Sequence, residues 1–100
     1  MDLRGKKVLV FGSGKSGIGA ADLLGKVGAN PIIYDGNKDV DVQAVIHKTQ
    51  GDYPLEVYAG ELPERVQESL DLVVLSPGVP TDIELVKSFY AQGLPVWVEV

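Results

Sequence analysis

The residues with the clearest chemical potential are three closely spaced glycines near the start of the chain. Residues 8–11 are apolar, and Gly12, Gly14 and Gly17 follow with the G-x-G-x-x-G spacing that joins a buried strand to a helix around a nucleotide. The first glycine permits a tight turn, the second leaves room for a ligand, and the third lets helix and strand pack closely. A helix that begins there directs unpaired N–H groups and its positive dipole end at the turn. The spacing therefore predicts a site for a nucleotide or its phosphates, with a ligand-free turn as the alternative.

The tripeptide Gly14-Lys15-Ser16 also matches the end of a Walker A loop, which wraps a triphosphate. That loop requires a glycine at position 9, where this chain has Leu9 inside the apolar run. We therefore exclude a Walker A loop, because too few residues remain to surround a triphosphate.

Two further polar segments follow apolar runs. Asp35-Gly36-Asn37 follows residues 31–34, so Asp35 is expected at the carboxyl end of the second strand, beside the glycine loop. An acidic residue there binds ribose hydroxyls in dinucleotide-binding domains, but Asp-Gly-Asn also suits a simple turn, and the sequence leaves both roles open. The second segment, 76–80, follows the buried run 72–75 and begins with Ser76, Pro77 and Gly78.

Apolar runs alternate with helical patterns along the whole chain. This alternation predicts an α/β fold, a Rossmann-like doubly wound sheet of five parallel strands in the order 3-2-1-4-5 with helices on both faces. In that order Gly12–Gly17 and Ser76–Gly78 face each other across one crevice, with Asp35 at its rim. The expected strands lie at residues 8–11, 31–34, 55–58, 72–75 and 96–98.

The first expected helix has a clear apolar pattern. Ala20, Leu23, Leu24 and Val27 have i, i+3, i+4, i+7 spacing, which predicts that they form its buried face, and Gly28 is expected to end it. Trp97, in the last strand, is expected to serve in packing or in a contact between domains, because no basic cluster accompanies it.

Composition restricts the function further. The 100 residues carry a net charge of −5 and no cysteine, which disfavours nucleic acid as a partner and excludes disulfides and thiolate metal sites. His47, the only histidine, lacks neighbours suited to a metal site or to catalysis, so we expect it on the surface or at a helix end. No apolar stretch is long enough to span a bilayer, so we expect one cytoplasmic domain over residues 1–100 that contacts no membrane.

Taken together, these segments resemble the N-terminal domain of the Mur ligases, most closely in the branch that adds D-glutamate. The resemblance covers essentially the whole chain, and the combination of the glycine loop with Ser-Pro-Gly-Val-Pro is more specific than either motif. The residues that carry it are Gly5–Val8, Gly12–Gly17, Asp35, Ser76–Pro80, Gly93–Val96 and Glu99.

The resemblance implies a monomeric domain that anchors the UDP part of UDP-N-acetylmuramoyl-L-alanine, an intermediate of peptidoglycan synthesis. It implies that Gly14, Lys15, Ser16 and Gly17 contact the diphosphate, and that Asp35, Gly36 and Asn37 contact uracil. Ser76, Pro77 and Gly78 would then lie near the phosphates or the sugar. The chain departs from the usual family pattern at Lys15 and at Gly36-Asn37, where Gly36 can offer only backbone to a base.

The resemblance also implies that the catalytic parts of such a ligase lie in other domains. In this family a central domain uses ATP and magnesium to activate the substrate carboxylate, and a third domain binds the amino acid. Neither domain is among these residues, so we expect weak UDP-sugar binding without catalysis, and no catalytic residue, metal ligand or cofactor in this chain. The rival interpretations are an NAD(P)- or FAD-binding Rossmann domain of an oxidoreductase or ligand-sensing protein, and an interaction domain without a ligand.

Overall fold

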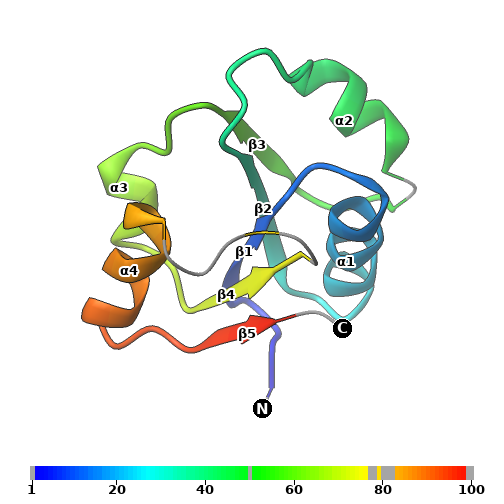
Figure 1. Cartoon of the computed structure of the whole chain (residues 1–100). Helices are drawn as coiled ribbons and strands as arrows, with labels where there is room; N and C mark the ends of the chain where they lie inside the picture. The colour runs from blue at the N-terminus through cyan, green and yellow to red at the C-terminus, as the bar shows by residue number, and fades with distance from the viewer. Residues whose placement is uncertain (1, 50, 77–78, 80–82, 99–100) are drawn as a thin grey trace.

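Five parallel strands form a single sheet in the order β3-β2-β1-β4-β5, with helices on both faces (Figure 1). The structure is a computed structural model that describes residues 2–49, 51–76, 79 and 83–98. The predicted fold class and strand order are confirmed, and β1 lies beside β4 where the winding direction reverses. In chain order the elements are β1 (Lys7–Phe11), α1 (Lys15–Lys26), β2 (Asn30–Asp35), α2 (Val42–Lys48), β3 (Glu56–Ala59), α3 (Glu64–Gln67), β4 (Leu72–Leu75), α4 (Glu84–Ala91) and β5 (Val96–Val98).

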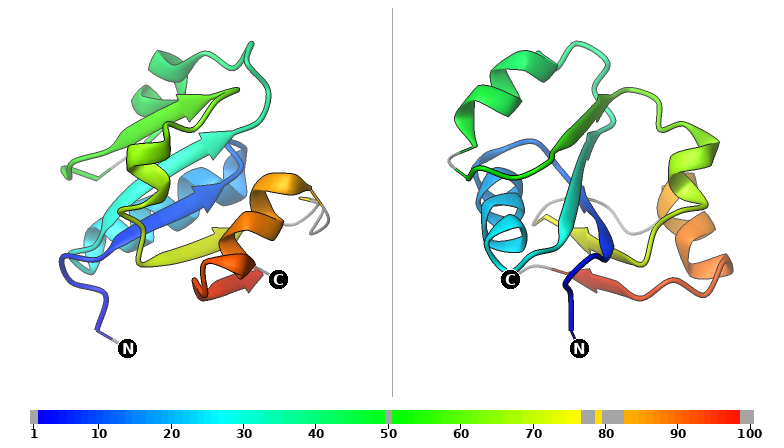
Figure 2. Two further views of the ribbon diagram at one scale, coloured as in Figure 1. Left: turned by 90° about the vertical axis from the view of Figure 1, so that its left-hand side faces the viewer. Right: turned by 180° about the vertical axis from the view of Figure 1, so that it is seen from behind.

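Alternate residues of the strands contribute to two separate core layers. The layer beneath α1 and α2 includes Val8 and Val10 of β1 together with Leu24 of α1. The layer beneath α3 and α4 includes Leu9 of β1 and Phe89 of α4 (Figure 2). Because the central strands are buried from both sides, their sequences are continuously apolar rather than alternating.

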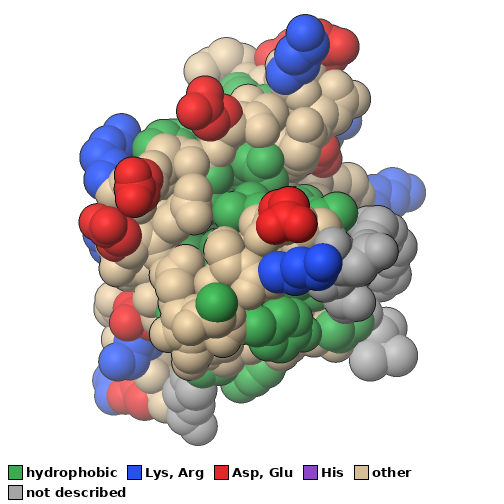
Figure 3. Space-filling view, turned by 60° about the vertical axis from the view of Figure 1, so that its left-hand side comes forward, with side chains coloured by type: hydrophobic (Ala, Val, Ile, Leu, Met, Phe, Trp, Pro, Cys, Tyr) green, Lys and Arg blue, Asp and Glu red, His purple; other side chains and the backbone are tan. Residues whose placement is uncertain are grey.

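The outer surface carries mixed charge. On the described part of the side that includes α3 and α4, basic side chains are separated by acidic and uncharged surface (Figure 3). Within the described ranges, no helix combines the length and the apolar character that crossing a membrane requires.

The buried face of α1 differs from the predicted one. Leu24 is buried, but its partner in the core is Ala21, while Leu23 and Val27 are 63% and 45% exposed. The inward stripe of the helix runs through Gly17, Ala21 and Leu24, at i, i+4 and i+7. The neighbouring apolar stripe, which contains Leu23 and Val27, faces away from β1 and β2. The periodicity therefore predicted the helix correctly, but the prediction of its buried face was wrong.

The contacts of Gly25 explain why a glycine occurs within α1. A Cβ atom at this position would overlap the ring of Tyr53, which packs directly on the helix backbone. The Tyr53 hydroxyl also donates a 2.6 Å hydrogen bond to Asp22, one turn earlier in α1. Tyr53 therefore holds the loop before β3 against α1. This packing is possible only because residue 25 has no side chain.

We predict that Gly25→Ala destabilises the domain, although the same substitution usually stabilises a helix by about 1 kcal/mol. The added methyl must displace Tyr53, and overpacking of this kind costs about 1–3 kcal/mol. Urea unfolding measures the change. In a Tyr53→Ala background the sign should reverse, because the clash is gone. Gly19→Ala is the matched control, since a Cβ there meets nothing within 4 Å and should stabilise. Stabilisation by Gly25→Ala in the presence of Tyr53 would contradict the packing described.

Candidate functional site

The carboxyl ends of β1, β2 and β4 meet at one edge of the sheet and hold three loops together. Gly12 donates a 2.7 Å backbone hydrogen bond to Tyr34 of β2, and Ser76 donates one of 3.1 Å to Phe11 of β1. A cavity of about 360 Å³ lies between these loops. The predicted convergence of the glycine loop, Asp35 and Ser76 is confirmed. The cavity is lined by Gly12, Ser13, Gly14, Lys15, Ser16, Gly17, Asp35, Ser76 and Val79.

Two of the three motif glycines, Gly12 and Gly17, have the predicted steric roles. Gly12 has a φ of +127°, and a Cβ there would lie 2.8 Å from the Ser76 hydroxyl oxygen. A Cβ on Gly17 would overlap the carbonyl of Gly12, so helix and loop touch through backbone alone. Gly14 differs, because its Cβ would meet nothing within 4 Å. Gly12 and Gly17 are thus required by the fold, whereas Gly14 is not, and Gly14 lines the cavity.

The first turn of α1 supplies hydrogen-bond donors without partners in the helix. Gly14 is the N-cap and offers no side chain, and the first turn contains no acidic residue. The first intrahelical bond to the cap is made by Ile18, which leaves the N–H groups of Lys15, Ser16 and Gly17 without a helical acceptor. These residues line the cavity, so the positive end of the helix dipole is available to an anion there.

The hydroxyl of Ser76 is an unpaired polar group in the same cavity. Ser76 is 8% exposed, and its Oγ atom is buried without a hydrogen-bond partner in the described part of the protein. An unsatisfied buried hydroxyl costs about 1–3 kcal/mol. Its position beside Gly12 and Gly17 makes it a donor that a ligand oxygen could satisfy.

The carboxylate of Asp35 joins the glycine loop to the end of β2. It accepts hydrogen bonds of 2.7 Å from the Ser13 hydroxyl, 3.2 Å from the Ser13 N–H and 2.9 Å from the Asn37 N–H. Burial raises the pKa of Asp35, but the bonds from Ser13 and Asn37 outweigh it, so the pKa lies below its usual value. Of the two roles left open by the sequence, the turn role is confirmed, and a ligand contact remains a prediction.

The structure brings together most of the predicted site residues. Lys15 and Ser16 are exposed at the start of α1, and Gly36 and Asn37 are exposed beside Asp35 but do not line the cavity. Pro77 and Gly78 lie outside the described residues.

Sequence reasoning missed Ser13. Its pairing with Asp35 depends on the register that places Phe11 opposite Tyr34, and no local pattern in the sequence specifies that register. The signal available was a hydroxyl residue one position after the first motif glycine, which is too common to be informative.

A catalytic metal site is not evident in the described ranges, where no cluster of at least three histidine, aspartate or glutamate side chains could hold a metal ion. His47 lies exposed in the last turn of α2, as the sequence predicted.

Comparison with known proteins gives a consistent result. The family model described as "Mur ligase MurD-like, N-terminal domain" matches residues 6–98. A UDP-N-acetylmuramoylalanine--D-glutamate ligase from Lachnospira eligens is 50% identical over the whole chain, which corresponds to 22% of that relative. Ligases of the same name from Lachnoclostridium phytofermentans and Caldicellulosiruptor saccharolyticus are 44% and 38% identical, again over the whole chain and 22% of each relative. The chain thus spans about one fifth of the length of these curated relatives.

We predict that the Ser13–Asp35 contact stabilises the domain in a pH-dependent way. Because the folded-state pKa of Asp35 is lowered, its contribution is fully present above the unfolded-state pKa of about 3.9 and is lost as the pH falls through the folded value. At pH 7, Asp35→Asn should lower the free energy of unfolding, and a double-mutant cycle with Ser13→Ala should give a coupling of about 1 kcal/mol, since the group is partly exposed.

Urea unfolding between pH 7 and about pH 3 measures both quantities. The difference between the wild type and Asp35→Asn should shrink below about pH 4. Asp39→Asn, at an exposed aspartate nearby, is the control and should change little. A deficit in Asp35→Asn that stays constant across this range would show that the carboxylate charge is not what holds the loop.

Proposed function

The chain belongs to the MurD-like N-terminal domain family of the Mur ligases, and on this premise we propose that it holds the UDP part of UDP-N-acetylmuramoyl-L-alanine. The parent protein would be the cytoplasmic ligase that adds D-glutamate to this substrate in peptidoglycan synthesis. The domain would contribute binding and orientation as a monomeric unit, while the chemistry takes place on other parts of the ligase.

One observation carries the proposal: unpaired donors converge on one cavity. The same space of about 360 Å³ is lined by Lys15, Ser16 and Gly17, whose N–H groups have no helical acceptor, and by Ser76, whose buried hydroxyl has no partner among the described residues. These donors need acceptors and negative charge, and a diphosphate supplies both through its anionic oxygens. The chain has a net charge of −5, so attraction must come from these local dipoles and from Lys15 rather than from the overall field.

The arrangement supports a specific division of contacts. The N–H groups of Lys15, Ser16 and Gly17, reached across the open side of Gly14, would bind the diphosphate. Ser76 would donate to a phosphate or sugar oxygen, and Pro77 and Gly78 would lie nearby in the same loop.

Uracil would bind beside Asp35, Gly36 and Asn37. Three of the roughly four acceptor positions of the Asp35 carboxylate are used by Ser13 and Asn37, which leaves one for a donor such as the uracil N3–H. Gly36 and Asn37 would contribute backbone groups to the base, because Gly36 has no side chain.

ATP and magnesium, which the family implies for the whole ligase, do not fit the residues of this chain. The glycine loop lacks the Walker A spacing, because Leu9 stands where that loop needs glycine. No metal-ligating cluster occurs among the residues that the structure describes. In our proposal this chain therefore binds substrate and does not catalyse ligation by itself.

We predict that UDP binds at this cavity and that Gly14→Ala blocks it. In an NMR titration of ¹⁵N-labelled protein, UDP should shift the amides of residues 14–17, Asp35 and Ser76, whereas NAD should leave them unchanged. Gly14→Ala should fold normally, because its Cβ meets nothing within 4 Å, yet weaken UDP binding about tenfold or more. Gly19→Ala, an equally open glycine outside the cavity, should bind UDP like the wild type. Shifts with NAD but not UDP would favour the dinucleotide-binding alternative.

We also predict that Ser76→Ala weakens UDP binding without lowering the stability of the domain. Removing an unpaired buried hydroxyl should leave the free energy of unfolding unchanged or slightly raise it. Losing a donor to the ligand should weaken UDP binding by about 1–2 kcal/mol, roughly 5- to 30-fold. Calorimetric titration and urea unfolding of the same variant test the pair of effects. Unchanged UDP affinity would remove Ser76 from the site.

A further inference from the structure

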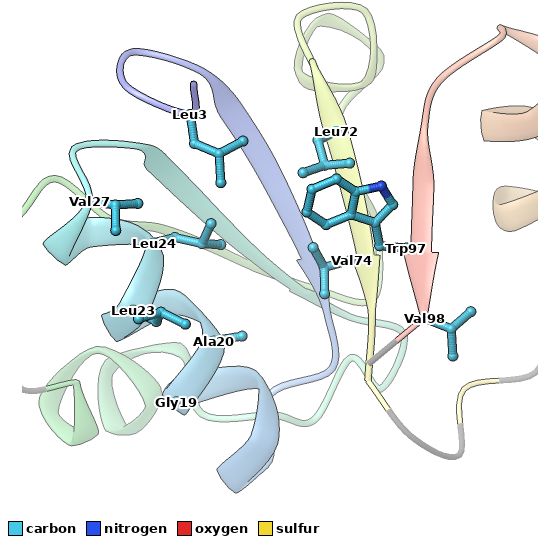
Figure 4. A pocket seen from close by; sticks show the side chains of 10 residues that line it. All are labelled: Leu3, Gly19, Ala20, Leu23, Leu24, Val27, Leu72, Val74, Trp97 and Val98. Atoms are coloured by element: carbon cyan, nitrogen blue, oxygen red, sulfur yellow. The ribbon is translucent and has the colours of Figure 1, made fainter. Parts of the chain in front are cut away.

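An apolar groove lies between α1 and the β4–β5 half of the sheet, away from the proposed nucleotide site. It encloses about 450 Å³, and every residue that lines it is apolar or glycine. Leu23 and Val27 project from α1 on one side, and Val74 and Trp97 lie on the strands opposite (Figure 4). A groove that is almost entirely apolar, with no charged, hydroxyl or amide side chain, is poorly suited to orienting a nucleotide or another polar ligand.

Large apolar side chains are exposed around this groove. Leu23, Val27, Trp97 and Val98 are between 45% and 63% exposed, and each lines it. A contiguous exposed apolar patch of this kind marks a surface that another element covers.

The arrangement of the helices explains why the groove is open. On this face α1 packs over β1 and β2, and α2 packs on β3. Among the described elements, the helices beside β4 and β5 lie on the opposite face, which leaves this face of the two strands without a helix (Figures 1 and 2). Parallel sheets are ordinarily covered on both faces, so the described elements leave this part of the sheet open to a further packing element.

We propose that this groove holds the segment that directly follows β5 in the full-length ligase, packed as an amphipathic helix beside α1. The inference rests on the proposed function, because it assumes the longer ligase. Two observations identify the occupant. The matching family model is an N-terminal domain and the relatives are far longer, so in such ligases the chain continues beyond β5. The last residue of β5, Val98, itself lines the groove, so a short connection brings the next element directly onto it.

A second copy of the chain fits the groove less well. A stable dimer needs about 800 Å² from each partner, whereas this groove is bounded by one helix and the edge of a sheet. One helix of ordinary length, about 10–14 residues, matches such a channel. The expected occupant therefore lies within about 20 residues after Val100, counting the connection.

Photo-crosslinking in the full-length ligase tests this assignment. A p-benzoylphenylalanine at Leu23 should crosslink to the roughly 20 residues that follow Val100, as mapped by mass spectrometry. The same probe at Tyr90, which is 53% exposed on α4, is the matched control and should not reach that segment. A crosslink to a more distant part of the ligase, a crosslink between isotopically distinct copies, or no crosslink would each overturn the proposal.

Trp97, the only tryptophan of these 100 residues, gives a second readout that does not depend on the probe. With any other tryptophan of the ligase replaced by phenylalanine, acrylamide should quench Trp97 severalfold less than expected for a side chain that is 47% exposed. Leu23→Glu should restore quenching and Tyr90→Glu should not. Unprotected Trp97 in the otherwise wild-type ligase would overturn the proposal. Neither measurement involves nucleotide, so a failed UDP titration would count against the proposed function alone.

Discussion

The approach of Gly17 to the carbonyl of Gly12 is the contact on which the rest of the site depends. Because neither residue has a side chain in the way, α1 begins within a few residues of the end of β1 and lies close against it. This closeness places the free N–H groups of the first turn at the same sheet edge as the loop after β4. Ser76 lies beside both glycines. A side chain at residue 12 would displace the Ser76 hydroxyl, and a side chain at residue 17 would push the helix away from the Gly12 carbonyl.

In our proposal an acidic protein binds an anion, so the local electrostatics of the cavity must differ from the field of the whole chain. The acidic side chain nearest the glycine loop, Asp35, has three hydrogen bonds from Ser13 and Asn37. These bonds stabilise its charge within the turn and leave the first turn of α1, which has no acidic residue, as the electropositive part of the cavity. The same carboxylate thus fixes the loop and is kept from competing with a phosphate for the helix donors.

Much of this organisation could be predicted from the sequence. Continuous apolar runs, glycine spacing and the right-handed crossover rule together specified the strand order and the meeting of three loops. Individual side-chain contacts between distant segments could not be predicted. The Ser13–Asp35 pairing depends on strand register, and the Tyr53–Gly25 packing depends on how a loop folds back over α1. The prediction of which face of α1 is buried was wrong for a physical reason. Leu23 and Val27 are as apolar as core residues, yet they face a groove.

The three glycines of α1 lie where the helix meets three different parts of the structure. Gly17 meets the backbone of Gly12 in the glycine loop, Gly25 meets the ring of Tyr53, and Gly19 lines the apolar groove. Each glycine costs about 1 kcal/mol relative to alanine in an isolated helix, so three in twelve residues make the helix weak by propensity alone. Tertiary contacts must therefore hold α1 in place, and the groove is the side on which those contacts are fewest. A helix seated there would stabilise the same element whose first turn faces the nucleotide cavity, so in our proposal the remainder of the ligase supports the binding site through α1.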